Sequence, residues 1–403
     1  MTDQAANRPN LPLAGVRVID FGQIYQGPYA TLLMAKAGAD VVKVEPLNGE
    51  PMRNRARTSK GAGVPLAMLN SNKRALTLNL KSEDGKALLK RLVKQADVLL
   101  ENFTPDVMNK LGVGWEVLHA VNPRLIYASG TGYGLTGPDR DMLAMDHTIQ
   151  AAAGLMSITG EAGGPPARAG GTPCDIMGGI HLYAGVLQAL LGREKTGKGT
   201  LVETAMVETM YFTLTSDLAA YHRTGELPQR RGDKSPANTA PYSRFRCKDG
   251  WIALICVSDA QWDRILTVIG REDLIGNADY GTREDRHAHE TEINGMIEAW
   301  CRDLPRDEAY AIMRKNRVPV APIRTLADVR ADAHMHERGM LKWANHPDMG
   351  EIVLPSAPIR LSDYPKEEVK FFPGIGADNS EVLREWLGLS DADIEDLTDG
   401  KII

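Results

Sequence analysis

Short apolar runs alternate with amphipathic stretches along the first half of the chain. The first series reads VRVIDF, GPYATLLMAKAGA and DVVKVE, which are residues 16–21, 27–39 and 40–45. A short apolar run is typical of a buried strand, whereas the longer middle segment, opened by the turn residues Gly27 and Pro28, is typical of a helix. The pattern therefore predicts a strand–helix–strand unit.

The same alternation continues to about residue 130. It predicts further strands at 75–80, 97–103 and 124–129, a helix at 82–96, and short helices at 104–112 and 113–121. Strands that alternate with helices form largely parallel, doubly wound sheets, so the predicted class is α/β. Ligands of such sheets bind at the carboxyl ends of the strands, here around 20–27, 78–81, 101–104 and 129–134.

The rest of the chain predicts a second, smaller domain. Residues 173–192 are apolar and read as a buried helix, followed by a strand at 200–206 and one helix that ends at Gly225. A basic, proline-bearing linker follows. Residues 242–256 then resemble a hairpin with Asp249 and Gly250 at its turn. We expect a large domain from 1–225, an α+β domain from 226–328, and a mostly helical segment, with one strand near EIVLP, from 329–403 that returns to the large domain.

Composition narrows the possible functions. The chain has 403 residues, 43% hydrophobic and 25% charged, with a formal net charge of −5, which argues against nucleic acid as a partner. The polar start MTDQAANRPN resembles no leader sequence, and charged and polar residues interrupt the apolar stretch, so we expect a cytoplasmic protein without membrane contact. The four cysteines form no CxxC pair and are expected to be reduced thiols.

Three tempting motifs lack the context that their chemistry requires. Residues 130–134 read GTGYG, but a turn follows them instead of the helix that a dinucleotide site needs. Residues 192–198 have P-loop spacing, yet Gly199 replaces the metal-binding hydroxyl, and a helix precedes the loop where a strand should; a charged turn after a helix is expected. The HxH pairs at 287–289 and 334–336 lie on predicted helices, where residues two apart face different directions, so no metal site is expected.

Asp175 is the candidate for chemistry. It stands in GGTPCDIMGG, between two glycine pairs and at the start of the apolar helix. Its simplest role is that of helix N-cap, which would also hold the carboxylate ionised and oriented as a nucleophile requires. Neighbouring Cys174 has no basic group nearby in the sequence to activate it, so a small buried side chain is expected.

Five ordered segments resemble the hallmark segments of the class III CoA-transferases, which include formyl-CoA, carnitine and succinyl-CoA-dependent dicarboxylate enzymes. They are residues 13–46, 69–81, 96–112, 122–137 and 165–199. The resemblance implies an interlocked homodimer of ring-shaped subunits, with Asp175 as the nucleophile. It also implies CoA contacts from Tyr25, Gln26, Leu78, Lys81, Asn102, Phe103, Thr104, Lys110 and the 143–146 stretch with Asp146.

The implied chemistry needs only a CoA thioester as substrate and no permanently bound cofactor. Asp175 would attack an acyl-CoA, form a mixed anhydride and then an aspartyl-CoA thioester, and pass CoA to a small organic or dicarboxylic acid. The glycines would give room to the acyl group and let backbone N–H groups approach its oxyanion. Lys81 and Lys110 are candidate partners of the CoA phosphates.

The sequence also departs from some relatives. Pro46 stands where some carry arginine, so a phosphate contact there would fall to one of three arginines, Arg53, Arg55 or Arg57. The segment SPANTAP replaces a glycine-run lid of the formyl-CoA enzymes, which disfavours formate or oxalate. Candidate anchors for a second carboxylate are Arg168, Arg230, Arg231 and Lys234, although solvated surface is the simpler interpretation of each.

Two other functions stay open. A 2-methylacyl-CoA racemase has the same fold and aspartate, but it pairs the aspartate with a histidine in a Gly-His-Asp segment. Here the corresponding residues read Ala144-Met145-Asp146-His147, in inverted order and without the glycine. A catalytically silent CoA-binding scaffold is the third possibility, and the intact Asp175 argues against it. We expect succinyl-CoA as the donor in the leading, transferase hypothesis.

Overall fold

The computed structural model describes residues 11–55, 63–232, 239–365 and 368–403, and they divide into two compact units. Unit 1 comprises Met1–Ala153, Gly170–Thr213 and Asp332–Ile403, and unit 2 comprises Gly154–Ala169 and Leu214–Ala331. The C-terminal segment Asp332–Ile403 groups with unit 1, and the short segment Gly154–Ala169, which we expected in the large domain, groups with unit 2. The boundaries at 225 and 328 stay a prediction.

Unit 1 is built on one six-stranded sheet in which all neighbouring strands are parallel. The strand order is β3-β2-β1-β4-β5-β6. The bounds are β1 (Arg17–Asp20), β2 (Asp40–Glu45), β3 (Arg74–Thr77), β4 (Val98–Glu101), β5 (Ile126–Thr131) and β6 (Leu201–Ala205). The predicted parallel α/β class is confirmed. The strand order changes direction between β1 and β4, because β2 and β3 lie on one side of β1 and β4, β5 and β6 lie on the other. In such sheets ligands bind at this point, beyond the carboxyl ends of the strands.

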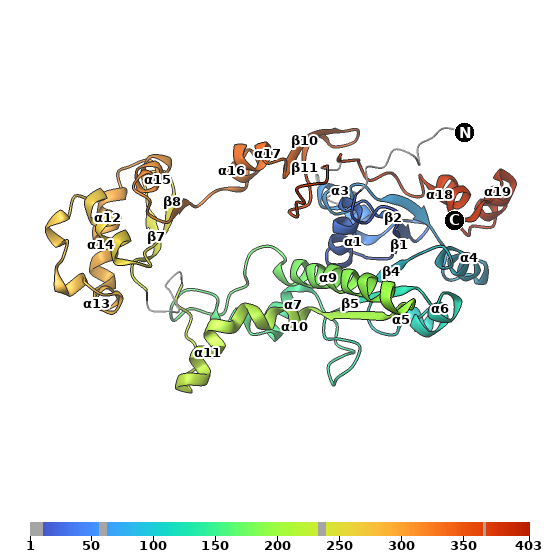
Figure 1. The fold of residues 1–403 in the computed structure, drawn as a ribbon, viewed down its shortest axis with the longest axis horizontal. Helices are drawn as coiled ribbons and strands as arrows, with labels where there is room; N and C mark the ends of the chain where they lie inside the picture. The colour runs from blue at the N-terminus through green and yellow to red at the C-terminus, as the bar shows by residue number, and fades with distance from the viewer. Residues whose placement is uncertain (1–10, 56–62, 233–238, 366–367) are drawn as a thin grey trace. The chain divides into compact units, whose positions relative to one another are not determined.

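Helices cover both faces of this sheet (Figure 1). The helices of unit 1 are α1 (Gln26–Lys36), α2 (Pro51–Arg55), α3 (Gly63–Asn70), α4 (Glu83–Val93), α5 (Val107–Lys110), α6 (Trp115–Val121), α7 (Asp146–Ala152), α9 (Pro173–Thr196), α10 (Met206–Tyr211), α17 (Ala333–Glu337), α18 (Asn379–Leu387) and α19 (Asp391–Asp399). Helices α1 and α9 pack side by side on one face, and α4, α6, α18 and α19 contribute to the core on the other.

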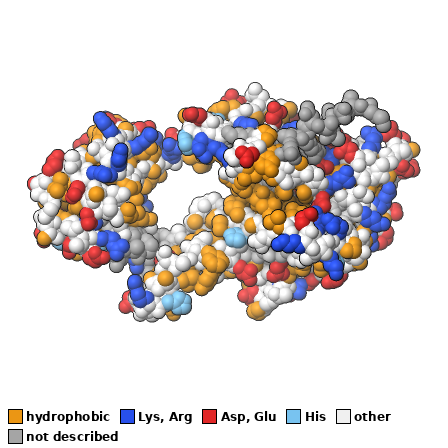
Figure 2. Space-filling model, in the orientation of Figure 1, with side chains coloured by type: hydrophobic (Ala, Val, Ile, Leu, Met, Phe, Trp, Pro, Cys, Tyr) orange, Lys and Arg blue, Asp and Glu red, His pale blue; other side chains and the backbone are white. Residues whose placement is uncertain are grey.

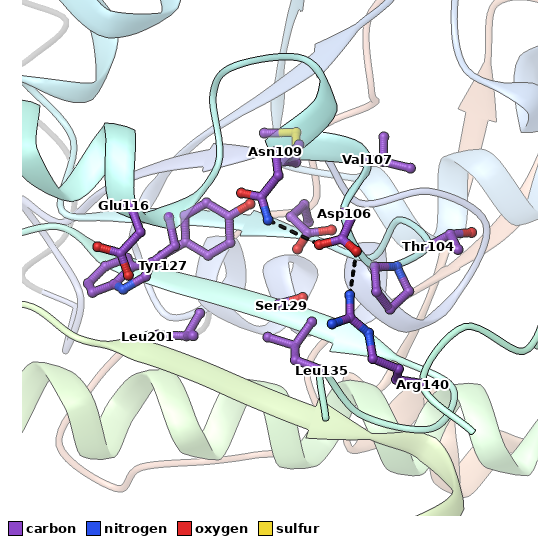
Figure 3. A pocket seen from close by; sticks show the side chains of 14 residues that line it. Thr104, Asp106, Val107, Asn109, Glu116, Tyr127, Ser129, Leu135, Arg140 and Leu201 are labelled. Carbon is purple, nitrogen blue, oxygen red and sulfur yellow. Dashed lines mark hydrogen bonds and ion pairs between the residues drawn. The ribbon is translucent and has the colours of Figure 1, made fainter. Parts of the chain in front are cut away.

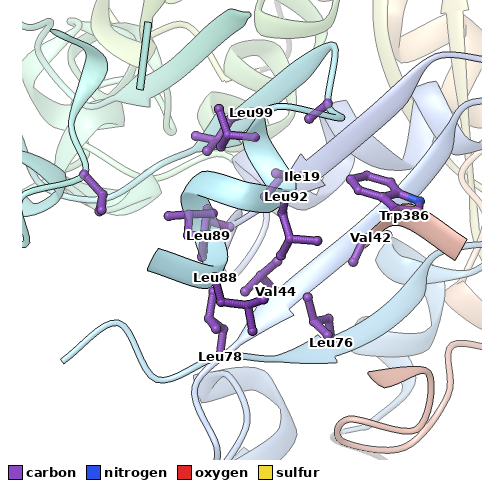
Figure 4. Packing of buried hydrophobic residues seen from close by; sticks show 14 of the residues in the cluster. Ile19, Val42, Val44, Leu76, Leu78, Leu88, Leu89, Leu92, Leu99 and Trp386 are labelled. Atoms are coloured by element: carbon purple, nitrogen blue, oxygen red, sulfur yellow. The ribbon is translucent and has the colours of Figure 1, made fainter. Parts of the chain in front are cut away.

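The strands are mostly apolar on both faces because each face has its own core. In β1, Val18 packs towards α1 and α9, whereas Ile19 packs towards α4 and α18. Figure 4 shows the second of these cores, where Leu89 and Leu92 of α4 and Trp386 of α18 meet the strands. These residues are at most 4% exposed, so the C-terminal helices belong to the same core as the first strands.

Unit 2 contains a three-stranded antiparallel sheet in the order β7-β8-β9. Its elements are α8 (Leu155–Ile158), α11 (Thr215–Thr224), β7 (Tyr242–Arg246), β8 (Trp251–Ile255), α12 (Asp259–Val268), α13 (Arg283–Ala288), α14 (Glu290–Cys301), α15 (Arg306–Lys315), β9 (Val320–Pro322) and α16 (Leu326–Arg330). The expected hairpin is confirmed, with Cys247 N donating to Gly250 O at its turn. The third strand, β9, was not predicted because it is only three residues long.

Three local expectations were incomplete. The helix expected to run to Gly225 is divided by a 3-10 turn at Phe212–Leu214, although Gly225 ends it in the left-handed conformation. The strand expected near EIVLP is one arm of a hairpin, β10 (Leu341–His346) with β11 (Gly350–Pro355). Helices α2 and α3 were not expected at all. All of these elements are short, so their apolar periodicity is weak.

Helix α9 carries the longest apolar stretch. It is long and apolar enough to cross a membrane by length and composition alone, and a third of that window is buried in the structure. Its buried face, which includes Leu182, Tyr183 and Val186, packs in the core with α1, so the expected burial holds for one face only. The helix ends at Gly197 in the left-handed conformation, which confirms a turn after a helix in place of a P-loop.

Candidate active site

Asp175 lies in the first turn of α9, but it is not the N-cap. The helix begins at Pro173, a residue favoured at the first helical position, so Asp175 is the third residue and the N-cap is Thr172. The capping oxygen comes from Asp146 at the start of α7: its Oδ2 accepts Cys174 N at 2.8 Å and Asp175 N at 3.3 Å. The expected N-cap role of Asp175 is therefore wrong, and its own carboxylate is left free of that task.

The electrostatics of Asp175 also differ from the expectation. Burial, and then the charge of Asp146, raise the pKa of Asp175 to about 7. A helix N-terminus stabilises an anion, but here desolvation and a second carboxylate outweigh it. The same two causes, together with Asp175 itself, raise the pKa of Cys174 to about 12, so Cys174 is the small buried thiol that the sequence predicted and no nucleophile at neutral pH.

The glycines after Asp175 serve close packing. A Cβ on Gly178 would lie 2.8 Å from Nε2 of Gln26, and a Cβ on Gly179 would lie 2.7 Å from O of Gln26 and 3.2 Å from the ring of Tyr29. These glycines lie three and four residues after Asp175, on the same face of α9. They bring the first turn of α1 against α9, which differs from the acyl room that we expected of them.

Gln26 is the side chain that this packing brings to the site. It is 2% exposed, and its Nε2 has no hydrogen-bond partner within the described residues. A buried N–H group without a hydrogen-bond partner lowers the stability of the fold. Near a candidate nucleophile, such a group is able to donate a hydrogen bond to a substrate. Gly130 at the end of β5 completes the contact, since a Cβ there would lie 2.9 Å from the Gln26 amide carbon.

The backbone N–H groups of the first turn of α9 are already used. Cys174 N and Asp175 N bond to Asp146, and Ile176 N donates to Thr172 O at 3.1 Å. The expected oxyanion donors from this turn are therefore taken, and the Gln26 amide is the available one that the structure shows. Asp146 is 7% exposed and caps α9, and its expected contact with CoA stays a prediction.

The other predicted CoA contacts lie at the carboxyl ends of β1, β3 and β4 or just beyond them. Asn102 is half-buried, and both polar atoms of its side chain are engaged by the backbone of Gln23. Leu78 is buried in the core below the sheet. The remaining predicted contacts are more open: Tyr25 and Phe103 are half-buried, with Phe103 against Phe21, and Lys81, Thr104 and Lys110 are exposed.

A cavity of about 230 Å³ lies over β5, where Tyr127 and Ser129 line it, and reaches Glu101 at the end of β4 (Figure 3). Thr104 lines it beside Asp106, which bonds to Asn109 and Arg140. Glu101 also lines the cavity. Burial raises the pKa of Glu101 to about 7, although hydrogen bonds from Ser129, Phe103 N and Tyr127 act in the opposite direction. Glu101 carried no motif, and only its place at the end of a buried strand could have drawn attention to it.

Most of the candidate arginines have structural partners. Arg53 binds Glu45 through Nε at 2.7 Å and through Nη2 at 2.8 Å, so it is committed to the fold. Arg55 also has a partner, and Arg57 and Lys234 lie outside the described residues.

The described candidates for anchoring a second carboxylate lie in unit 2. Arg230 donates to Gly164 O at 2.8 Å and to Ser157 O at 3.2 Å. Arg168, Arg230 and Arg231 all belong to unit 2, whereas Asp175 belongs to unit 1. Residues 235–238 of the SPANTAP segment also lie outside the described residues.

Metal and racemase chemistry find little support in the geometry. Within the part of the chain that the structure describes, no three His, Cys, Asp or Glu side chains gather as metal ligands. His147, the histidine nearest to the racemase pattern, is exposed on α7, while its neighbour Asp146 caps α9. The racemase would pair Asp175 with a histidine, whereas His147 is exposed beside the residue that caps α9.

Comparison with known proteins identifies the family of this chain. The family model for CoA-transferase family III matches residues 13–379. The beta subunit of succinyl-CoA–L-malate CoA-transferase from Chloroflexus aurantiacus is 36% identical over 399 residues, which is 98% of each chain. Formyl-CoA:oxalate CoA-transferase from Streptomyces avermitilis is 34% identical over 97% of this chain and 99% of its own.

A solved structure gives the same answer. The crystal structure of a CAIB/BAIF family protein from Brucella suis matches with a TM-score of 0.84 and 31% identity, over 94% of this chain and 100% of that one. The sequence resemblance, the doubly wound sheet and the curated relatives agree, so this chain is an enzyme that belongs to the CoA-transferase family III.

Proposed function

We propose that this enzyme moves CoA from an acyl-CoA, with succinyl-CoA as the donor, to a small organic or dicarboxylic acid through covalent intermediates on Asp175. The observation that carries the proposal is a partly buried carboxylate in the first turn of α9, with its helix capped by another residue and an unpaired amide donor packed one turn away. The name of the Chloroflexus relative supports succinyl-CoA as the donor.

The reaction proceeds by exchange of thioester for thioester. An oxygen of Asp175 attacks the acyl carbonyl, the C–S bond breaks, and CoA thiolate leaves a mixed anhydride. The thiolate attacks the aspartyl carbonyl and expels the first acid as a carboxylate, which leaves an aspartyl-CoA thioester. The acceptor carboxylate attacks that carbonyl, and the released thiolate attacks the acceptor's acyl carbon, which forms the new CoA thioester and restores Asp175.

Gln26 and Asp146 have different tasks in this proposal. Each attack places negative charge on a carbonyl oxygen, and the Nε2 of Gln26 donates to it, because this N–H is buried and otherwise unpaired. Asp146 holds the first turn of α9 through two backbone N–H groups, and its charge adds to the raised pKa of the nucleophile. Lys81 and Lys110, both exposed, bind the CoA phosphates.

Trapping tests the covalent step. Incubation with succinyl-CoA and then hydroxylamine should convert an aspartyl thioester or anhydride into a hydroxamate, found by mass spectrometry on the peptide spanning residues 170–193. The same incubation with succinate alone should leave the peptide unchanged. A protein that turns over succinyl-CoA with no adduct on Asp175 contradicts the mechanism.

The dependence on pH follows from the raised pKa of Asp175. Only the ionised carboxylate attacks, so kcat/KM for the acyl-CoA should rise about tenfold per pH unit up to about pH 7 and then level off. Asp146→Asn keeps an oxygen that can cap α9 but removes the charge, so the rise should move to lower pH. Burial, the larger cause, remains, and the apparent pKa should stay above 3.8. Initial rates from pH 5 to 9 check this, and an unshifted curve would show that Asp146 carries no charge near Asp175.

We also propose that the enzyme is a cytoplasmic homodimer, as the resemblance implies. Hydrophobic side chains gather on the face of unit 1 over α1 and α9 (Figure 2). Exposed apolar side chains include Leu191 on α9, Tyr211 at the end of α10 and Phe212 in the 3-10 turn that follows, which are 69%, 57% and 75% exposed. Such side chains are unusual on a monomer's surface, and a second copy of this chain is the proposed cover.

A further inference from the structure

The loop between β1 and α1 contains an unfavourable backbone conformation. Ile24 has φ of 64°, in the left-handed region, where a β-branched side chain is rarely found. The other non-glycine residues with positive φ among the described residues are Asn72, Asp106, Arg317 and Lys401, none of them β-branched. Such a conformation persists only where the surroundings determine it, and it is found most often at functional sites.

Side chains from the ends of three strands hold this loop residue by residue. Asp20 accepts Gly22 N at 2.7 Å, and Lys43 of β2 donates to Gly22 O. Asn102, just after β4, accepts Gln23 N at 2.7 Å and donates to Gln23 O at 3.0 Å. The next residue, Ile24, directs its N–H towards a carboxylate oxygen of the buried Glu50, at 3.4 Å.

Asn102 has a special place in this arrangement. Both polar atoms of its side chain bond to Gln23, so it presents the loop with the paired donor and acceptor of a neighbouring strand. The clamp also sets the start of α1, because a Cβ on Gly27 would lie 2.9 Å from Asn102 Oδ1 and 2.8 Å from Gly22 Cα. Gln26, the first residue of α1, lies directly between the clamped loop and α9.

We propose that Asn102 is a positioning residue that, with the strained Ile24, fixes the backbone of residues 22–25 and thereby aims the Gln26 amide at the reacting carbonyl. The inference rests on the proposed function. It assigns Asn102 an action through the loop, since its polar atoms are occupied and not available to CoA. A preorganised donor stabilises a transition state without having to reorient, so the loss of this clamp lowers kcat more than it raises KM.

The test compares two asparagines whose side chains each hold distant backbone through two hydrogen bonds. Asn122 donates to Val93 O and Ala96 O at 2.8 and 2.9 Å, before the amino end of β5 and so at the opposite edge of the sheet. Asn102→Ala and Asn122→Ala should lower the melting temperature alike. Only Asn102→Ala should lower kcat, by at least tenfold, with KM for succinyl-CoA within about threefold of wild type. Asn102→Asp, which keeps an acceptor for Gln23 N, should recover part of kcat.

A second variant covers the case in which Asn102→Ala does not fold. Ile24→Gly relieves the backbone strain, so kcat should fall while the melting temperature does not. The matched control is Arg317→Gly, which relieves a positive φ in unit 2 and should leave kcat unchanged. Values of kcat for Asn102→Ala or Ile24→Gly within twofold of their controls would overturn the inference. Absence of a hydroxylamine adduct on wild-type Asp175 would instead overturn the proposed function, so the two failures are distinguishable.

Discussion

Asp175→Asn should abolish CoA transfer and, at the same time, stabilise the protein at neutral and alkaline pH. The amide cannot attack a thioester, so kcat should fall by at least about 10⁴-fold. The gain in stability follows from the pKa, which the fold raises from 3.8 to about 7 by burial and by the charge of Asp146. Ionising the wild-type carboxylate in the folded state therefore costs free energy, up to about 4 kcal/mol, and the variant avoids this cost.

The pH dependence gives this prediction a sign that can be checked. A folded-state pKa above the unfolded value means that the wild type loses stability as pH rises from about 4 to 7. The advantage of Asp175→Asn should be absent near pH 4, should grow through that interval, and should be constant above pH 7. Urea unfolding at pH 5 and pH 8, at one protein concentration, measures it. A variant that is less stable than wild type at pH 8 would mean that Asp175 is paired in the fold.

Lys73→Met should lower the free energy of unfolding by about 3–5 kcal/mol. Lys73 Nζ is buried and binds Asp20 Oδ2 at 2.9 Å, and it also bonds to Thr31, Asn70 and Pro28 O. Burial alone would raise the pKa of Asp20, but the charges of Lys73 and Lys43 outweigh it and lower the pKa. Removal of Lys73 leaves Asp20 buried with less compensation, and a buried charge that loses its partner is costly.

Two further variants separate this effect from a simple loss of an ion pair. Lys86→Met removes a pair with Glu83 whose side chain is 87% exposed, so its effect should stay below about 1 kcal/mol. The double variant Asp20→Asn/Lys73→Met leaves no unpaired charge at this place. It should therefore recover part of the free energy of unfolding that Lys73→Met loses. Urea unfolding of the four proteins at pH 7 provides the comparison. If Lys73→Met lowered the free energy of unfolding no more than Lys86→Met does, the buried charge of Asp20 would not depend on Lys73 for its stability.

Local patterns were sufficient for the large sheet and for the position of the nucleophile candidate. The runs of β1, β2, β4 and β5 are mostly apolar and buried on both faces, with buried polar residues such as Lys43 as exceptions, and the alternation with helices leads directly to a parallel sheet. Asp175 was visible because it stands between two glycine pairs at the start of a long apolar helix, in a segment that resembles a hallmark segment of the family. Short elements such as α2 and β9 carry too few residues to show a period.

Only the tertiary structure decided the surroundings of Asp175. Asp146 lies 29 residues before it, and the Asn102–Gln23 clamp joins residues 79 apart, so neither pair has a signal within one helix or strand. The raised pKa of Asp175 depends on burial by elements distant in sequence, and helix-end chemistry alone suggested the opposite direction. Sequence determined the elements and the nucleophile candidate through local periodicity. The cap, the unpaired amide and the strained loop exist only once the ends of separate strands and helices meet at one edge of the sheet.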